Sequence, residues 1–159
     1  MMKKWALVIF VSTLSISACS KKVAKDESQL PTAANADETS GDSDSGKAMG
    51  LQTIHFAYDA YTLTDEAKSI LKANAQILKD KPTVRIQVEG HCDQRGGIQY
   101  NIALGEKRAN SVKKFLADQG IAGDRVSVIS YGKEKLVDSA ENEAAYAKNR
   151  RANFAITSR

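Results

Sequence analysis

The hydrophobic pattern between residues 51 and 159 changes its period several times, and these changes limit the folds that the chain can adopt. Residues 53–58 read as a strand, and Thr64, followed by two acidic residues, is typical of a helix start. Apolar residues then recur at helical spacing until Pro82 ends the helix. Residues 83–89 alternate between apolar and polar side chains, as a half-buried strand does. The predicted buried stripe of the first helix is Ala67, Ile70, Leu71, Asn74 and Leu78.

The rest of this region continues the alternation of helix and strand. A second helix is predicted over residues 99–119, because Gly120 is a typical helix stop. Two further strands are predicted over 126–132 and 149–157, joined by a polar segment. Residues 51–159 are therefore predicted to form an α+β domain of order βαβαββ. Its two layers are a mixed four-stranded sheet and helices on one face of it.

The first residues of the chain have the features of a bacterial lipoprotein signal. Two lysines precede an apolar run over residues 5–16, which is shorter than the ~20 residues needed to span a bilayer. The run ends in the sequence ISAC, which resembles a lipobox, where the Cys is acylated and becomes the first mature residue. Residues 1–18 are predicted to be a signal peptide and Cys19 the lipidation site, with a plain secretory signal as the alternative.

Residues 19–50 are predicted to be the lipidated Cys and a flexible tether. They contain no aromatic residue and are rich in Ser, Ala, Asp and Thr, so they bury too little apolar surface to offset the entropy of ordering. Ser20 and Lys21 follow the Cys, and the lack of an Asp there favours the outer membrane over the inner one. We therefore expect a lipid-anchored protein on the periplasmic face of the outer membrane.

Charge argues against a nucleic-acid partner. The formal net charge of the whole chain is +4, which is too mild to indicate binding to a polyanion. The positive charge lies in the folded region, because residues 20–50 hold four Lys against six Asp or Glu.

The stretch EGHCDQRGG, residues 89–97, gathers side chains that serve catalysts, metal sites and charged binding sites. If the alternation of the preceding strand continues, Cys92 points toward the helices, whereas His91 and Asp93 point to the other side. A thiol nucleophile needs a base within hydrogen-bonding reach, and His91 is predicted to face away from it. Cys92 is therefore interpreted as a small core residue. A hydrolase that uses Cys92 and His91 stays the enzymatic alternative.

A metal site is not predicted. Structural zinc sites take four ligands, usually from pairs of Cys and His. With Cys19 lipidated, the chain offers one Cys and two His. No metal, cofactor or disulfide is expected.

Asp93 and Arg108 suggest a charged grip. Asp93 lies in the loop before the second helix, and Arg108 lies on the same helical stripe as core residues. A partly buried Arg needs an anionic partner. Two kinds of interpretation stay open. In the first, Asp93 and Arg108 form an internal salt bridge, or Arg108 reaches to water. In the second, the two charges open on a shared pocket. The second arrangement suits a ligand with an adjacent ammonium and carboxylate. The stripe comprises Asn101, Gly105, Arg108, Val112 and Phe115.

Residues 51–159 resemble the OmpA-like domain family, in particular its lipid-anchored members. Six sequence blocks carry the resemblance. It is specific because the blocks occur in the family's order and follow a lipobox and a tether. They are HFAYD (55–59), LTDEAKSIL (63–71), VEGHCDQRGG (88–97), YNIALGEKRANSV (100–112), VSVISYGKEK (126–135) and AYAKNRRANF (145–154).

The resemblance implies a binding protein that is not an enzyme. Members of this family bind the peptide stem of peptidoglycan through meso-diaminopimelate, and by motif match Asp93 and Arg108 carry the two recognition charges. The resemblance also implies a Tol-Pal-type system, with a TolB-like periplasmic protein as partner, or anchoring of a different envelope complex. The other residues predicted to contact peptidoglycan are Phe56, Asp59, Gly90, His91, Arg95, Asn101 and Arg151.

Three positions depart from the family pattern. Ala57 stands where a carboxylate is common, which removes a secondary contact. Gln94 stands for Glu, which makes the site less acidic. Cys92 stands for Ala, which keeps a small residue and agrees with its interpretation as a core position.

Overall fold

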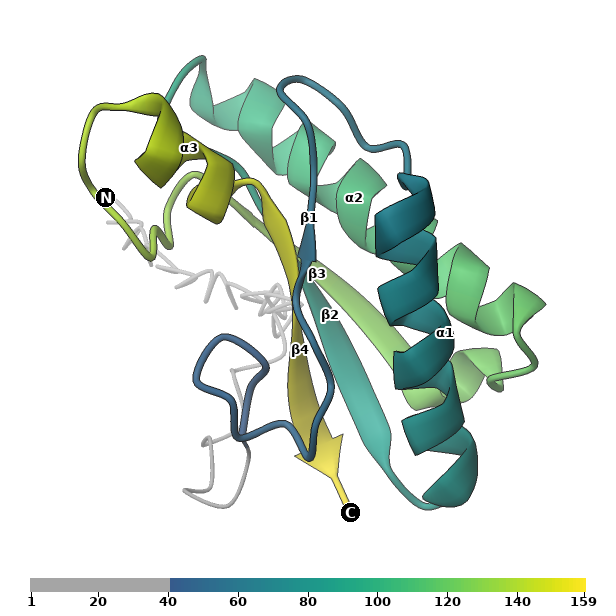
Figure 1. The fold of residues 1–159 in the computed structure, drawn as a ribbon. Helices are drawn as coiled ribbons and strands as arrows, with labels where there is room; N and C mark the ends of the chain where they lie inside the picture. Colours follow the sequence, from purple (N-terminus) through teal and green to yellow (C-terminus); the bar gives the residue numbers. More distant parts are fainter. Residues whose placement is uncertain (1–40) are drawn as a thin grey trace, which may run out of the picture. The chain divides into compact units, whose positions relative to one another are not determined.

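The computed structural model describes residues 41–159, which form one mixed sheet with helices packed against it (Figure 1). The signal peptide, Cys19 and tether residues up to 40 lie outside the described residues. The spatial order of the strands is β1-β4-β2-β3, in which β2 and β3 are parallel and the other pairs antiparallel. The strands are β1 (Ile54–His55), β2 (Arg85–His91), β3 (Val126–Gly132) and β4 (Arg151–Ser158). The helices are α1 (Asp65–Asp80), α2 (Ile98–Asp118), the 3-10 turn η1 (Gly123–Arg125) and α3 (Glu143–Asn149).

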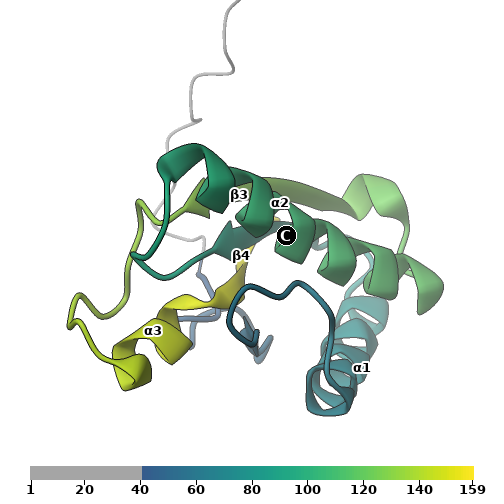
Figure 2. The ribbon, with the colours of Figure 1, turned by 90° about the horizontal axis from the view of Figure 1, so that it is seen from above.

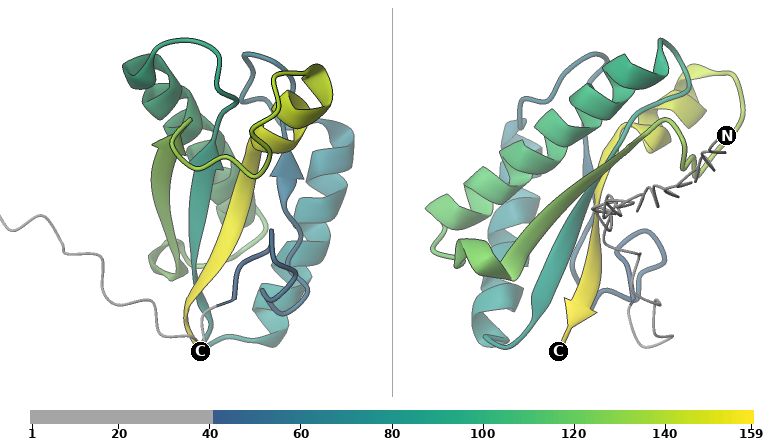
Figure 3. Two further views of the ribbon diagram at one scale, coloured as in Figure 1. Left: turned by 90° about the vertical axis from the view of Figure 1, so that its left-hand side faces the viewer. Right: turned by 180° about the vertical axis from the view of Figure 1, so that it is seen from behind.

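The two long helices cover one face of the sheet, so the predicted two-layer architecture is confirmed (Figure 3). A parallel strand pair needs a crossover connection, and α2 provides it between β2 and β3. Helix α1 begins as predicted, with the Thr64 hydroxyl accepting a hydrogen bond from the Ala67 amide at 3.1 Å. The core between the layers includes Leu71, Leu78, Ile86, Val88, Val112, Leu116, Phe154 and Ile156.

Helix α2 and strand β2 approach each other closely at two glycines. A Cβ atom on Gly90 would lie 1.9 Å from the carbonyl oxygen of Gly105. Neither position can therefore carry a side chain without moving the backbone. Gly90, predicted to contact ligand, has this packing role and does not line the cleft described below.

Two local predictions were wrong. The polar segment before the last strand contains α3, which lies where β4 begins (Figure 2) and is capped by the Asn142 side chain on the Ala145 amide at 3.0 Å. Alanines and polar residues over seven positions gave too weak a periodic signal for a helix. Strand β1 is two residues long instead of covering 53–58, because it pairs with β4 only at Ile54 and His55, and β4 begins at Arg151, the partner of His55.

The residues before the predicted domain start at Leu51 also contact the sheet. Residues 41–50, here called the junction segment, pack on β4 instead of belonging to the tether. Asp42 forms an antiparallel bridge with Ala155, and the Ser43 amide donates to the Phe154 carbonyl at 2.9 Å. Ala48 is fully buried in the core. These contacts use backbone groups and short side chains. The sequence of residues 41–50 therefore has no hydrophobic periodicity from which the packing could be predicted. No helix among residues 41–159 combines the length and hydrophobicity that crossing a bilayer requires.

Candidate binding cleft

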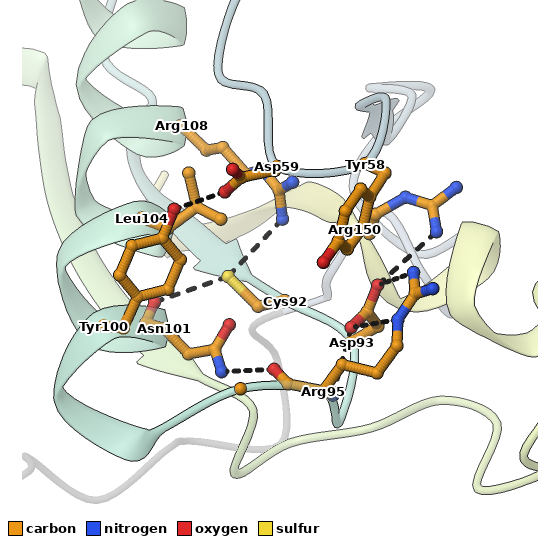
Figure 4. Close-up of a pocket in the computed structure, with 11 residues that line it drawn as sticks. Tyr58, Asp59, Cys92, Asp93, Arg95, Tyr100, Asn101, Leu104, Arg108 and Arg150 are labelled. Carbon is orange, nitrogen blue, oxygen red and sulfur yellow. Dashed lines mark hydrogen bonds and ion pairs between the residues drawn. The ribbon is translucent and has the colours of Figure 1, made fainter.

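A cleft with a volume of about 60 Å³ opens where three segments meet (Figure 4). They are the turn after β1, the loop after β2, and the first turns of α2; the end of α3 closes one side. The lining residues are Tyr58, Asp59, Cys92, Asp93, Arg95, Gly96, Tyr100, Asn101, Leu104, Arg108 and Arg150. Five of the predicted contact residues are thus brought together: Asp59, Asp93, Arg95, Asn101 and Arg108.

Arg108 lies in the floor of the cleft and is 1% exposed. Its guanidinium donates to three backbone carbonyls, those of Ala60 at 2.8 Å, His91 at 2.8 Å and Ala57 at 3.2 Å. The Phe56 ring lies beside the guanidinium, 5.2 Å from its carbon to the ring centroid. Burial lowers the pKa of Arg108, but an Arg stays protonated in proteins. Carbonyl dipoles hold this cation, and it forms no ion pair with a carboxylate among residues 41–159.

Asp93, 5% exposed, is paired with two arginines, neither of them Arg108. Arg95 donates to both carboxylate oxygens, from Nη2 at 2.7 Å and from Nε at 3.2 Å. Arg150 Nη1 lies 3.4 Å from the same carboxylate. Burial acts to raise the pKa of Asp93, but the hydrogen bonds from Arg95 and Arg150 hold it below its ordinary value. The internal Asp93–Arg108 salt bridge considered from the sequence is therefore wrong.

Arg150 was missed by sequence reasoning, which chose Arg151. Arg150 is the C-cap of α3, outside the alternation of β4, and its side chain also bonds to the Phe56 carbonyl at 3.1 Å and to Glu143 at 2.8 Å. Arg151 is the first residue of β4 and pairs with Asp44 of the junction segment at 2.7 Å. Without knowledge of α3, nothing in the sequence distinguished the two.

The rim of the cleft is aromatic and polar. The Tyr100 hydroxyl donates to the Asp59 carboxylate. The Arg95 guanidinium lies between two rings, 4.3 Å from the centroid of Tyr58 and 4.2 Å from that of Tyr146. Asn101 shapes the loop, because its side-chain amide donates to the Arg95 carbonyl at 2.7 Å and to that of Gly97 at 3.1 Å.

Cys92 and His91 do not form a catalytic pair. Cys92 is 1% exposed, faces the helices as predicted, and its sulfur contacts the Asn101 carbonyl at 3.3 Å and Arg108 Nη1 at 3.4 Å. Burial raises the pKa of this thiol. The His91 ring, also 1% exposed, stacks near Tyr131 on the other face, and neither ring nitrogen has a hydrogen-bond partner in the described part of the chain.

Asp93 was predicted to share the face of His91, and this was wrong. Strand β2 ends at His91, so its alternation does not extend to Asp93, which lines the same cleft as Cys92. Phe56, His91 and Arg151, predicted as contact residues, do not line the cleft. Phe56 and the His91 carbonyl support Arg108 from behind. In residues 41–159, no group of three or more His, Cys, Asp or Glu is placed to hold a metal ion.

Comparison with known proteins identifies the family of this fold and cleft. Residues 55–150 match the OmpA family. The chain belongs to the OmpA family. The peptidoglycan-associated lipoprotein of Pasteurella multocida is 45% identical over 103 residues, which cover 65% of this chain and 69% of that protein. Among solved structures, the peptidoglycan-associated lipoprotein from Burkholderia pseudomallei matches with a TM-score of 0.64 and 37% identity, over 66% of this chain and 89% of that one.

A second similar solved structure is the cell wall anchor of the T6SS from Pseudomonas aeruginosa. It is 27% identical and has a TM-score of 0.58, over 67% of this chain and 80% of that one. In the present OmpA-family domain, three guanidinium groups and two carboxylates line the cleft. Glu143 pairs with Arg150 at 2.8 Å and lies 3.6 Å from Arg95. The cleft therefore combines fixed charges of both signs, as suits a small ligand that carries both charges.

Proposed function

We propose that this protein anchors the cell envelope by binding peptidoglycan non-covalently, through the diaminopimelate of the peptide stem. That residue carries an ammonium and a carboxylate on one carbon. Arg108 takes the carboxylate, and Asp93 takes the ammonium. The protein acts by binding and not by catalysis.

One observation carries this proposal: Arg108 is a buried cation that is held only by neutral acceptors. Burying a charge without a counter-charge costs roughly several kcal/mol. An anion bound beside Arg108 would offset this cost. Three carbonyls fix the guanidinium, and Arg108 lines the cleft in which that anion would bind. The relatives named peptidoglycan-associated lipoprotein support a cell-wall carboxylate as the anion.

The finer parts of the proposal concern position in the envelope. Cys19 is lipidated and holds the protein to the periplasmic face of the outer membrane, and the residues between Cys19 and the junction segment let the domain reach the wall. The protein works in a Tol-Pal-type system with a TolB-like periplasmic partner. Changing Cys19 to Ser should release the protein from the membrane pellet; if the variant stays there after a salt wash, the lipid anchor is refuted.

The test is a pull-down of the full-length chain, in detergent, on purified sacculi, with free meso-diaminopimelate as competitor. We expect retention that the competitor reverses. Asp93→Ala and Arg108→Ala should each lose retention while remaining folded. Normal retention by both folded variants would refute the site.

A different envelope complex is the second candidate, and the likeness to the secretion-system wall anchor favours it. It shares the wall-binding cleft and differs in partner. Copurification with Tol proteins supports the first candidate, whereas copurification with components of another envelope assembly supports the second. The hydrolase alternative has no support from the geometry of Cys92 and His91.

A further inference from the structure

The two charges proposed to bind the ligand are not equally available. Both oxygens of Asp93 already accept from Arg95, at 2.7 and 3.2 Å, and Arg150 adds a third contact at 3.4 Å. Arg108 has no carboxylate partner within the described residues. An incoming carboxylate therefore meets a cation that has no carboxylate partner among residues 41–159, whereas an incoming ammonium meets an anion that is already paired.

The two partners of Asp93 differ in how firmly they are held. The Arg150 side chain is 8% exposed and is tied to the Phe56 carbonyl at 3.1 Å and to Glu143 at 2.8 Å. The Arg95 side chain also lies near Glu143, at 3.6 Å, but it is 36% exposed and comes from the loop after β2. Water can solvate the Arg95 guanidinium if it leaves Asp93, so Arg95 is the partner that can move.

Two aromatic rings define where Arg95 rests. The guanidinium carbon lies 4.3 Å from the Tyr58 centroid and 4.2 Å from the Tyr146 centroid, a stacking that favours a cation between them. Tyr58 lines the cleft, whereas Tyr146 belongs to α3 and does not line it. Tyr146 can therefore be changed without altering the cleft lining.

We propose that Arg95 determines specificity as a tethered competitor that occupies the ammonium position on Asp93. The inference rests on the proposed function and deepens it. A ligand with a free carboxylate binds first at Arg108, and its ammonium then replaces the guanidinium of Arg95. The cleft thereby rejects amines that lack a carboxylate, and stem residues whose carboxylate is amidated.

Three small probes separate the two charges. meso-Diaminopimelate carries both, heptanedioate carries only the carboxylates, and 1,5-diaminopentane carries only the amines. We expect NMR titrations of the full-length chain in detergent to rank their affinities in that order. Arg95→Gln should bind the diamine and diaminopimelate more tightly, by about three- to tenfold, as suits the loss of one partly exposed ion pair. The same change should weaken heptanedioate binding.

Arg85→Gln is the matched control, because Arg85 forms a surface pair with Asp124 at the other end of β2 and is expected to change no affinity. Tyr146→Leu removes one stacking ring without touching the cleft and should tighten diaminopimelate binding by about twofold. It carries the test if Arg95→Gln does not fold. Unchanged or weaker diaminopimelate binding by the folded variants, with a wild type that binds, would overturn this inference alone. If the wild type binds neither the probes nor sacculi, the proposed function falls with it.

Discussion

The consecutive residues Arg150 and Arg151 belong to two buried polar regions that differ in how their charges are paired. Arg151 faces the junction segment, where its Nε lies 2.7 Å from the Asp44 carboxylate. Beside it, the Asn153 amide donates to Glu89 at 2.9 Å and accepts from the Ser43 hydroxyl at 2.7 Å. Arg150 faces the cleft, where the buried cation Arg108 has only carbonyls and a thiol around it.

The two regions differ in whether their buried charges are paired within the protein, and the unpaired charge lies in the proposed ligand site. Opposite charges neutralise each other in the junction, so its polar groups need nothing from outside, and breaking them should cost stability. In the cleft, Arg95 and Arg150 pair with Asp93 and Glu143, whereas Arg108 has no carboxylate partner among residues 41–159. Changes there should cost binding more than stability.

The largest effect is expected from Gly90→Ala, which should break the cleft and leave the junction intact. The new Cβ would lie 1.9 Å from the Gly105 carbonyl oxygen, so α2 must move away from β2, and Arg108 moves with it. We expect a loss of about 3 kcal/mol in the free energy of unfolding by urea. Gly123→Ala is the control, because its Cβ would meet no atom within 4 Å. Equal stability of the two variants would contradict the close approach.

Arg108→Ala comes next and should separate binding from stability. Losing charge-assisted hydrogen bonds to one carboxylate weakens sacculus binding by roughly ten- to a hundredfold. Arg125→Ala is the matched control, because Arg125 also donates to three backbone carbonyls, those of Val84, Leu78 and Lys81, away from the cleft. Both variants should melt at lower temperature than the wild type. If Arg125→Ala loses binding as strongly as Arg108→Ala, the loss reflects general destabilisation and not a ligand contact.

Asp44→Ala tests the junction and should have the reverse pattern. The Arg151 side chain is 5% exposed and the Asp44 side chain 22%, so the change leaves a buried cation that water reaches only in part. We expect a loss of about 2 kcal/mol in the free energy of unfolding, below the cost for a fully buried pair. Sacculus binding per folded molecule should be unchanged. Asp118→Ala, which removes an exposed pair with Lys114, should alter neither quantity measurably.

Sequence predicted the elements whose signals are local. The alternation in β2, the Thr64 cap and the stop at Gly120 are short-range patterns, and each corresponds to the element that the structure has. The junction segment and α3 could not be predicted because long-range contacts hold them. Asp42 contacts Ala155, and Arg150 at the end of α3 contacts Asp93, across gaps that no periodicity reports.

The cleft was predictable only in part for the same reason. A charged residue on an otherwise apolar helical stripe identified Arg108 as a buried cation, and the structure has it 1% exposed. The partners of Asp93 were not predictable, since they depend on the loop after β2 and on the end of α3. Alternation failed at Asp93 because β2 ends at His91 and the loop after it has no strand period.

The smallest effect is expected at Cys92, the position where alternation did succeed. Its thiol is 1% exposed, and burial raises its pKa, so little of the reactive thiolate forms near neutral pH. A maleimide should therefore label the native protein slowly and the urea-denatured protein quickly. Cys92→Ala removes a weak sulfur acceptor for Arg108, at 3.4 Å, and a weak thiol donor to the Asn101 carbonyl, at 3.3 Å. The three carbonyl contacts of Arg108 remain, so sacculus binding should change by less than about twofold. Fast native labelling, or loss of binding in the folded variant, would place the thiol among the groups that act on the ligand. Cys92 could then no longer be described as a buried residue that only supports Arg108.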